Sequence, residues 1–278
     1  GENIKITQNL PSDAKGTITY IFANGTLINV INVNESFVLS NLDAGSYVIY
    51  GYYSGDTNHK SARDSLTITV NKAINNIIVS GENTAYPQNT TIKVTADIDG
   101  EYAVVIGDKK IIVNVINGIG TGSIALNAGK YTANIEYTNK NYENNIKSTA
   151  FNVAKANITL SIEVLDKVYN SNIDGNIFAS IDGEYNVIIN GNTIPVTVKN
   201  GIGEFNLGTL KVGDYSISVI YNGNKNYNSN SNTTTFKVTE TGTNFNIIAN
   251  STNITYGENI KITQKLPSDA KGTITYIF

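Results

Sequence analysis

The sequence predicts an all-β protein built of tandem β-sandwich modules, and three observations lead to this class. Gly45, Gly129 and Gly213 occupy matching segments that are 84 residues apart in both steps. Apolar and polar residues alternate with period two in "YTANIEY" and "YSISVIY", as they do in half-buried strands. Turn signals fall every eight to twelve residues, and no stretch of ten or more residues has helical periodicity.

The repeat is carried by "LDAGSYVIYGYYSGDTNHKSARDSLTITV", "LNAGKYTANIEYTNKNYENNIKSTAFNV" and "LKVGDYSISVIYNGNKNYNSNSNTTTFKV". A second signature pairs "IDGEYAVVIGDKKIIVNVINGIG" with "IDGEYNVIINGNTIPVTVKNGIG". The Asn117–Gly118 and Asn200–Gly201 dipeptides between alternating segments predict hairpins. About seven short strands in 84 residues are typical of an immunoglobulin-like sandwich. Such modules joined by short junctions predict an elongated rod.

The chain ends with a copy of its own beginning. "GENIKITQNLPSDAKGTITYIF" at Gly1–Phe22 returns at Gly257–Phe278 with Lys265 in the place of Asn9. One block of three modules is therefore complete, and the duplicated segment begins a fourth module. We expect module 1 at residues 1–73 without its first strand, module 2 at 74–155, module 3 at 156–239 and a partial module 4 at 240–278. With no start methionine and no leader, the sequence reads as a piece of a longer array.

Composition narrows the classes of function. The net charge is −3 over 278 residues, without blocks of like charge, so nothing favours nucleic acid or an anionic membrane surface as a partner. No apolar run approaches the length that spans a bilayer, so we expect no membrane insertion by this segment. The absence of cysteine excludes disulfides and thiolate chemistry.

A Leu-x-x-Gly-x-Tyr motif occurs once in each of the first three modules. It predicts a tyrosine corner at the start of strand F, where the tyrosine hydroxyl bonds to backbone a few residues upstream. A buried tyrosine needs such a partner, and we prefer this interpretation to a row of tyrosines that stack on carbohydrate. The expected structural residues are Leu42, Gly45, Tyr47, Leu126, Gly129, Tyr131, Leu210, Gly213 and Tyr215.

No set of residues predicts catalysis. His59 is the only histidine, and one histidine makes neither a triad nor an ordinary zinc site. The pairs Asp99/Glu101 and Asp182/Glu184 would each face one side of a strand. No nucleophile or base accompanies them, so we interpret them as turn residues. We expect no catalytic residue, no metal site, no cofactor and no enzyme activity.

The loops after strand F are rich in oxygen-bearing side chains. Calcium prefers such ligands, but the third loop has no carboxylate, and turns favour the same residues. In these loops His59 occupies the place that Tyr142 and Tyr227 occupy in the other modules. A Lys–Asn isopeptide bond would need a buried lysine beside an asparagine and a carboxylate, and no recurring spacing singles out such a trio. Calcium and isopeptide cross-links therefore stay open. The loop residues are Asp56, Asn58, Asn139, Asn141, Glu143, Asn222, Asn224 and Asn226.

With these motifs, the modules resemble the bacterial-type Ig-like repeats of large adhesin-like surface proteins, especially those of methanogenic archaea. The resemblance rests on Tyr256–Tyr276, the Leu-x-x-Gly-x-Tyr motif, the "YSGDTNH" and "YNGNKNY" segments, and the closing "TITV" and "FKV" strands. It implies an extracellular, cell-surface, non-enzymatic protein whose sandwiches act as a stalk. Seven Asn-x-Ser/Thr acceptors would fit a glycosylated surface, namely Asn24, Asn34, Asn89, Asn157, Asn232, Asn250 and Asn253.

Two classes of function remain open. In the first, the chain is a structural stalk or filament whose partners are neighbouring modules or copies of the same chain, because the junctions Asn71–Ala73 and Ala154–Ala156 are too short for free articulation. In the second, exposed tyrosines contact cell-surface glycans or other cells. The tyrosines considered are Tyr50, Tyr52, Tyr142 and Tyr227.

The duplicated ends add an alternative to the stalk. Module 1 lacks the strand that "FNIIANSTNITY" would supply, and the partial module 4 is expected to hold strands A to C with nothing to close on. Open edges favour strand addition, which would join chains head to tail, although we prefer one continuous array. The candidate strand-donor residues are Phe245, Ile247, Ile248, Ile254 and Tyr256.

Overall fold

The computed structural model describes residues 2–277, so Gly1 and Phe278, at the outer ends of the duplicated segments, lie outside the described residues. The described secondary structure is entirely β-strand, which confirms the predicted all-β class. No described segment is a helix of the length and hydropathy needed to cross a membrane. The described chain divides into two compact units, residues 2–154 and 155–277.

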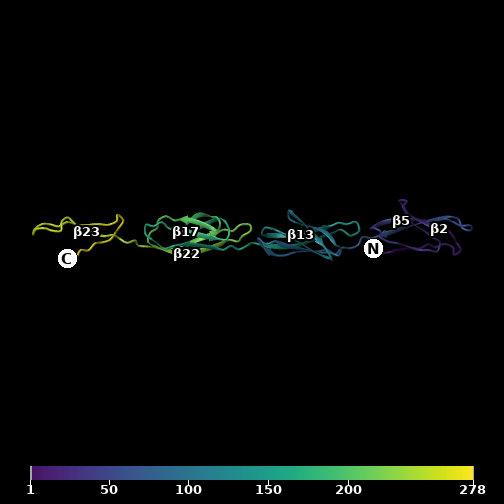
Figure 1. Cartoon of the computed structure of the whole chain (residues 1–278), viewed down its shortest axis with the longest axis horizontal. Helices are drawn as coiled ribbons and strands as arrows, with labels where there is room; N and C mark the ends of the chain where they lie inside the picture. Colours follow the sequence, from purple (N-terminus) through teal and green to yellow (C-terminus); the bar gives the residue numbers. More distant parts are fainter. Residues whose placement is uncertain (1, 278) are drawn as a thin grey trace. The chain divides into compact units, whose positions relative to one another are not determined.

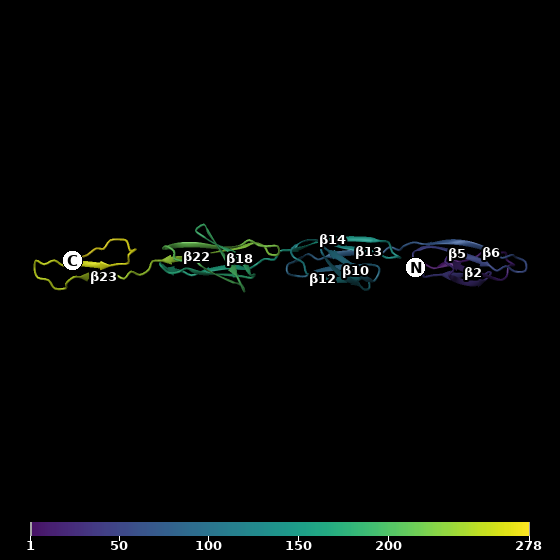
Figure 2. The same cartoon turned by 90° about the horizontal axis from the view of Figure 1, so that it is seen from above.

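The first unit opens with a small sandwich, called the first sandwich. A four-stranded antiparallel sheet has the order β3-β2-β5-β6, and a second sheet pairs β1 with β4. Figure 1 labels β2 and β5, and Figure 2 labels β6 as well. The strands are β1 (Ile4–Ile6), β2 (Thr17–Phe22), β3 (Leu27–Asn32), β4 (Phe37–Leu39), β5 (Gly45–Tyr53) and β6 (Ala62–Val70).

The second sandwich completes the first unit and has sheet orders β11-β10-β13-β14-β8 and β12-β9-β7. All its strand pairs are antiparallel except β8, which runs parallel to β14. The strands are β7 (Ile78–Gly81), β8 (Thr84–Ala85), β9 (Thr90–Thr95), β10 (Gly100–Ile106), β11 (Lys109–Val115), β12 (Ile119–Ile124), β13 (Gly129–Tyr137) and β14 (Asn145–Ala154).

The second unit contains the third sandwich and a terminal hairpin. The third sandwich repeats the second, with orders β16-β22-β21-β18-β19 and β15-β17-β20, and the terminal hairpin pairs β23 with β24. The strands are β15 (Leu160–Val164), β16 (Lys167–Val168), β17 (Asp174–Ala179), β18 (Gly183–Ile189), β19 (Asn192–Val198), β20 (Ile202–Asn206), β21 (Gly213–Tyr221), β22 (Asn230–Thr239), β23 (Asn246–Ala249) and β24 (Ile262–Lys265).

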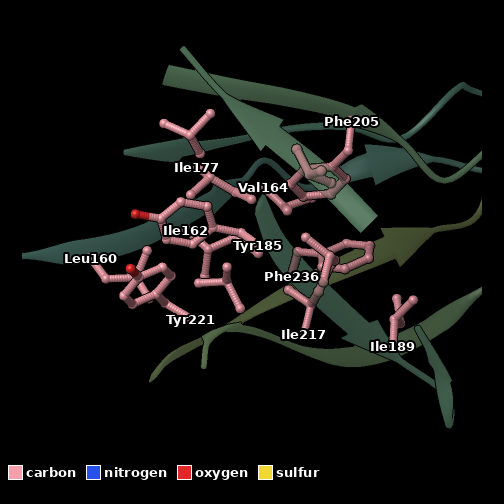
Figure 3. Close-up of a cluster of buried hydrophobic side chains, with 14 of the residues drawn as sticks. Leu160, Ile162, Val164, Ile177, Tyr185, Ile189, Phe205, Ile217, Tyr221 and Phe236 are labelled. Carbon is pink, nitrogen blue, oxygen red and sulfur yellow. The ribbon is translucent and has the colours of Figure 1, made fainter. Parts of the chain in front are cut away.

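Each sandwich has its own core, formed by the alternate residues that face the opposite sheet. In the third sandwich, Tyr185, Ile177 and Ile217 are fully buried among the side chains drawn in Figure 3. Burying each such side chain contributes about 1.5–3 kcal/mol. The first sandwich has a smaller core, with seven buried residues described against 16 and 17 in the other two. It therefore closes less completely.

Two expectations about local structure need correction. Asn117 and Gly118 both have positive φ, at 53° and 81°, which suits a tight turn. However, β11 and β12 belong to different sheets and share only the bridge between Ile116 and Ile119. The dipeptide therefore turns the chain from one layer to the other instead of building a ladder, and Asn200–Gly201 does the same between β19 and β20.

The terminal hairpin differs from the expected strands A to C. Residues 246–249 and 262–265 pair, but residues 273–277 form no strand. The same residues in the first copy form β2, which pairs with β5 and β3. No such partners follow within residues 240–277, so this third segment has no ladder to join.

Candidate functional site

The Leu-x-x-Gly-x-Tyr tyrosines each donate a hydrogen bond from the hydroxyl to the carbonyl oxygen four residues upstream. Each stands two residues after the glycine that begins its strand, and each ring is half-buried. Leu126 and Leu210 pack with the cores of their sandwiches. The donor–acceptor pairs are Tyr47–Asp43 at 2.9 Å, Tyr131–Asn127 at 2.9 Å and Tyr215–Lys211 at 2.8 Å.

A second set of tyrosines with the same bond was missed by the sequence reasoning. Tyr102 donates to the Ile98 carbonyl at 2.7 Å, and Tyr185 donates to the Ile181 carbonyl at 2.9 Å. These rings are only 2% and 0% exposed, and burial raises the pKa of the Tyr185 hydroxyl to about 12. The repeated "IDGEY" was the signal, because it places tyrosine four residues after isoleucine in both modules.

The acidic residue of "IDGEY" belongs to a turn. The Asp99 carboxylate accepts the backbone N–H groups of Asn117 and Gly118 at 2.8 and 2.9 Å. The bonds from Gly118 and Asn117 hold the pKa of Asp99 below its usual range. Asp182 accepts from Gly201 at 3.0 Å in the third sandwich. These carboxylates fasten the Asn-Gly turns.

Asp56 organises the loop that follows β5. Its carboxylate accepts the backbone N–H groups of Lys15, Asn58 and His59 at 2.7, 2.8 and 2.7 Å, and the Tyr53 hydroxyl at 3.0 Å. These bonds, led by the one from Lys15, hold the pKa of Asp56 well below its usual range. The His59 ring lies 3.0 Å from the same carboxylate through Nδ1. The loop residues Asp56 and Asn58, for which calcium binding was left open, therefore close a turn.

In the other two loops, an asparagine side chain closes the turn. The Asn139 side chain accepts from the Asn141 N–H at 2.8 Å, and the Asn224 side chain accepts from the N–H groups of Asn226 and Tyr227 at 2.8 and 2.9 Å. Among residues 2–277, no three His, Cys, Asp or Glu side chains cluster closely enough to hold a metal ion. No lysine is among the buried residues of this range.

The residues that follow β6 dock onto the loop of the second sandwich. The Ala73 N–H donates to the Asn141 carbonyl at 2.9 Å, and the Glu143 N–H donates to the Ala73 carbonyl at 2.8 Å. The Lys72 ammonium donates to the Asn139 carbonyl at 3.1 Å. The second unit repeats this geometry between its own linker and loop, with the pairs Ala156–Asn226 at 2.9 Å, Asn228–Ala156 at 2.9 Å and Lys155–Asn224 at 2.6 Å.

Within the first unit, the Asn141 side chain also contacts the corner turn of the first sandwich. Its Oδ1 accepts the Ala44 N–H at 2.9 Å, and its Nδ2 donates to the Asp43 carboxylate at 2.8 Å. The Lys140 ammonium lies 2.8 Å from the same carboxylate. The hydrogen bond from Lys140, which has the larger effect, and the one from Asn141 hold the pKa of Asp43 below its usual range. The hydrogen bond with Asp43 in turn raises the pKa of Lys140. We call Asp43, Ala44, Lys140 and Asn141 the junction cluster.

The tyrosines considered for ligand binding fall into two groups. Tyr142 and Tyr227 pair with the linker residues Ala73 and Ala156. Tyr50 and Tyr52 lie side by side on β5, with ring centroids 6.4 Å apart and Tyr52 38% exposed. Of the glycosylation acceptors, Asn24, Asn34, Asn89, Asn157, Asn250 and Asn253 are exposed, and Asn232 is half-buried within β22.

No family model and no curated protein sequence matches this chain. Among solved structures, it is similar to the I9–I11 tandem of titin (13% identity, 86% of this chain and 94% of that chain, TM-score 0.30). It is also similar to the four N-terminal Ig domains of Dscam1 (11% identity, 85% of this chain and 69% of that chain, TM-score 0.32). A third similar structure is a Ca²⁺-stabilised adhesin with which an Antarctic bacterium binds ice (13% identity, 86% of this chain and 68% of that chain, TM-score 0.28). Likenesses this weak carry no argument about function.

Proposed function

We propose that the chain is a structural tandem-repeat segment of an extracellular, adhesin-like cell-surface protein, and that its modules form a semi-rigid, non-enzymatic stalk or filament. Its modules span residues 1–73, 74–155 and 156–239, with a partial module at 240–278. Support comes from the junction cluster, in which one side chain, Asn141, bonds to both Asp43 and Ala44 of the preceding sandwich.

The junction cluster favours a preferred orientation of the two sandwiches. The exposed ion pair between Lys140 and Asp43 contributes little by itself, because water screens both charges. It acts together with the Asn141 bonds and with the backbone bonds of Ala73. Several directional bonds at one short linker limit rotation more than any one of them does.

The tyrosine corner is proposed to support this junction. Tyr47 donates to the carbonyl of Asp43, and Asp43 and Ala44 are the residues that contact Asn141. The hydroxyl therefore fastens the turn that the next sandwich contacts. We propose the same structural role, that of shaping this turn, for Tyr131 and Tyr215.

The orientation is testable because the sequence has no cysteine, so two labels can be placed without background. Spin labels at Asn24→Cys and Lys110→Cys, one on each sandwich of the first unit, would report their separation by pulsed electron paramagnetic resonance. We expect a narrow distance distribution in the parent and a broader one in Asn141→Ala, with Asn134→Ala, at an exposed position of β13, as the matched control. A broad distribution in the parent would rule out a semi-rigid junction.

A second candidate function rests on Tyr50 and Tyr52. Adjacent aromatic rings with polar tips are common in recognition surfaces, so this pair could bind cell-surface glycans. Titration of the chain with soluble glycans by calorimetry would test this, with Tyr50→Ala/Tyr52→Ala as the variant. Heat that is unchanged in the double variant would remove these residues from any binding site.

A further inference from the structure

The three-stranded sheets of the second and third sandwiches each turn one face away from the core. In the second sandwich this sheet has the order β12-β9-β7, and in the third it has the order β15-β17-β20. Along these strands buried residues alternate with residues that are partly or fully exposed, so the latter share one face. We call the exposed side chains of the two sheets the second outer face and the third outer face.

An apolar row crosses one end of the second outer face. Ile78 on β7 and Ile119 on β12 both pair with Thr95, which lies between them on β9. Ile116 extends the row through its bridge to Ile119. Ile78, Ile119 and Ile116 are 67%, 53% and 67% exposed. Contiguous exposed apolar side chains mark interaction surfaces more often than scattered ones do.

The third outer face has an apolar row at the same register. Phe178 on β17 pairs with Ile202 on β20 as Thr95 pairs with Ile119 in the second sandwich. Phe178 and Ile202 are 39% and 48% exposed. On the other side of Phe178 the row continues with the small Ser161, and an open hollow of about 260 Å³ is lined by residues that include these two. An isoleucine side chain is small enough to enter this hollow.

The next row of the second outer face carries a positive charge at its centre. It consists of Ser80, Lys93 and Thr121, with Lys93 paired to both of the others. Lys93 is exposed, and it forms no ion pair among residues 2–277. The acidic residue Glu82 lies one row further along, where its N–H donates to Thr91. The ammonium group in the middle of the face is therefore available to a carboxylate of another molecule.

The corresponding row of the third outer face is negative. Glu163 and Glu204 lie on either side of Asn176 and both pair with it. Both glutamates are exposed, and neither forms an ion pair among the residues that the structure describes. Asp174 adds a third carboxylate one row further along β17, and an open hollow of about 480 Å³ is lined by Asp174, Asn176 and Glu204 among others. Lys199 lies outside this row, in the turn before β20.

We propose that the second outer face of one chain binds the third outer face of a second copy, so that chains associate side by side. Sheets packed face to face keep their strands within about 30° of each other, so each row can lie on the corresponding row of the other copy. The apolar rows then cover each other, and Lys93 lies between the carboxylates of Glu163 and Glu204. Two second outer faces would instead oppose lysine to lysine, and two third outer faces would oppose glutamates to glutamates.

The proposed contact is small and joins two different faces. Strands about 4.8 Å apart that rise about 3.3 Å per residue give each face about 14 Å by 20 Å, which is less than the area that holds a stable dimer. We therefore expect weak association that depends on concentration. Because each contact leaves the other face of both chains free, association can continue beyond a dimer. A single stalk needs no such contact, so this proposal does not rest on the proposed function.

The first test measures self-association of the full chain. Sedimentation velocity over a hundredfold range of concentration should show association of the parent that weakens as salt is added, because salt screens exposed charges. We expect Lys93→Glu to weaken association at least tenfold. Lys147→Glu, at an exposed position of β14 on the other sheet, is the matched control and should change it less than threefold. Since both side chains are exposed, both variants should melt at the temperature of the parent.

Exchanging the charges between the two faces is the second test. The double variant Glu163→Lys/Glu204→Lys should lose association as Lys93→Glu does. An equal mixture of these two variants should associate again, because each supplies the charge that the other needs on a separate chain. The triple variant, with all three substitutions in one chain, should regain association by itself, because its second outer face is negative and its third outer face is positive.

Three results would overturn the proposal. The first is a parent that stays monomeric over the whole range of concentration. The second is equal weakening by Lys93→Glu and Lys147→Glu, since net charge and not the second outer face would then control association. The third is a mixture of the Lys93→Glu and Glu163→Lys/Glu204→Lys variants that stays monomeric, since the two faces would then not bind each other between chains.

Discussion

Gly81 and Phe151 approach so closely that a methyl group on Gly81 would lie 2.4 Å from Cδ1 of the ring. The two residues come from opposite sheets, β7 and β14. Their sizes are therefore coupled, and a change in one constrains the other.

We predict that Gly81→Ala destabilises the second sandwich by about 1–3 kcal/mol through overpacking. Phe151→Ile should also destabilise it, by about 1–3 kcal/mol, because it leaves a cavity. The double variant should cost less than the sum of the two, with a coupling of at least about 0.5 kcal/mol. Hydrogen exchange of peptides from β13 and β14 measures each variant, and strict additivity would contradict the coupling of these two side-chain sizes.

The hydroxyls of Tyr131 and Tyr185 lie in different environments, so removing each one should lower stability by a different amount. Tyr131→Phe deletes a bond at a half-buried position and should cost about 0.5–1.5 kcal/mol. Tyr185→Phe leaves the Ile181 carbonyl without its partner beside a fully buried ring and should cost about 1–3 kcal/mol. Exchange protection in the respective sandwiches reports both, with Tyr52→Phe on the surface as the control. A larger loss for Tyr131→Phe would reverse this ranking.

The Asp56 loop should be sensitive to acid. The folded-state pKa of Asp56 lies below its value of about 4 in an unfolded chain. Its bonds therefore contribute stability above about pH 4, and this contribution is lost as the pH falls through the folded pKa. Asp56→Asn should lower the melting temperature by a few degrees at pH 7, and the difference from the parent should shrink toward pH 2.

Asp108→Asn, in the exposed turn between β10 and β11, is the control for the loss of a carboxylate. It removes an exposed carboxylate at pH 7 without touching the Asp56 loop, so its melting temperature at pH 7 should stay close to that of the parent. The difference in melting temperature between Asp56→Asn and the parent can stay constant from pH 7 to pH 2 only if the carboxylate charge does not stabilise the loop, so a constant difference contradicts this prediction.

Accessibility should decide which asparagines carry glycans. Asn232 lies in the middle of an antiparallel pair, opposite Val219, whereas Asn24 lies in an exposed turn. Glycopeptide mass spectrometry after expression in a glycosylating host should find Asn24 occupied and Asn232 largely unmodified. Full occupancy at Asn232 would mean that modification precedes the formation of β22.

The all-β fold could be predicted from the sequence because each strand shows its buried face by alternation. Ile217 and Val219, for example, are buried on β21, and the Leu-x-x-Gly-x-Tyr motif marks the start of that strand at Gly213. The Asn117–Gly118 turn was also visible, but its connection between two sheets was not, since that depends on where β9 and β10 lie.

The junction cluster was beyond sequence reasoning for a similar reason. Asp43 and Asn141 are nearly a hundred residues apart, and each resembles an ordinary turn residue in its own segment. Only the docking of Ala73 onto the second loop brings them together. The repeated "IDGEY", by contrast, contained enough information to predict a bond for Tyr185, because spacing along one chain fixes that contact.

The parallel pairing of β8 with β14 and of β16 with β22 has a mechanical consequence. In each sandwich these strands lie near opposite chain ends, so a tensile load pulls them along their length in opposite directions. Their hydrogen bonds are then loaded together in shear instead of breaking one after another. The second and third sandwiches both have this clamp among their described strands, so each should resist a sudden extension and yield in one step instead of unravelling gradually.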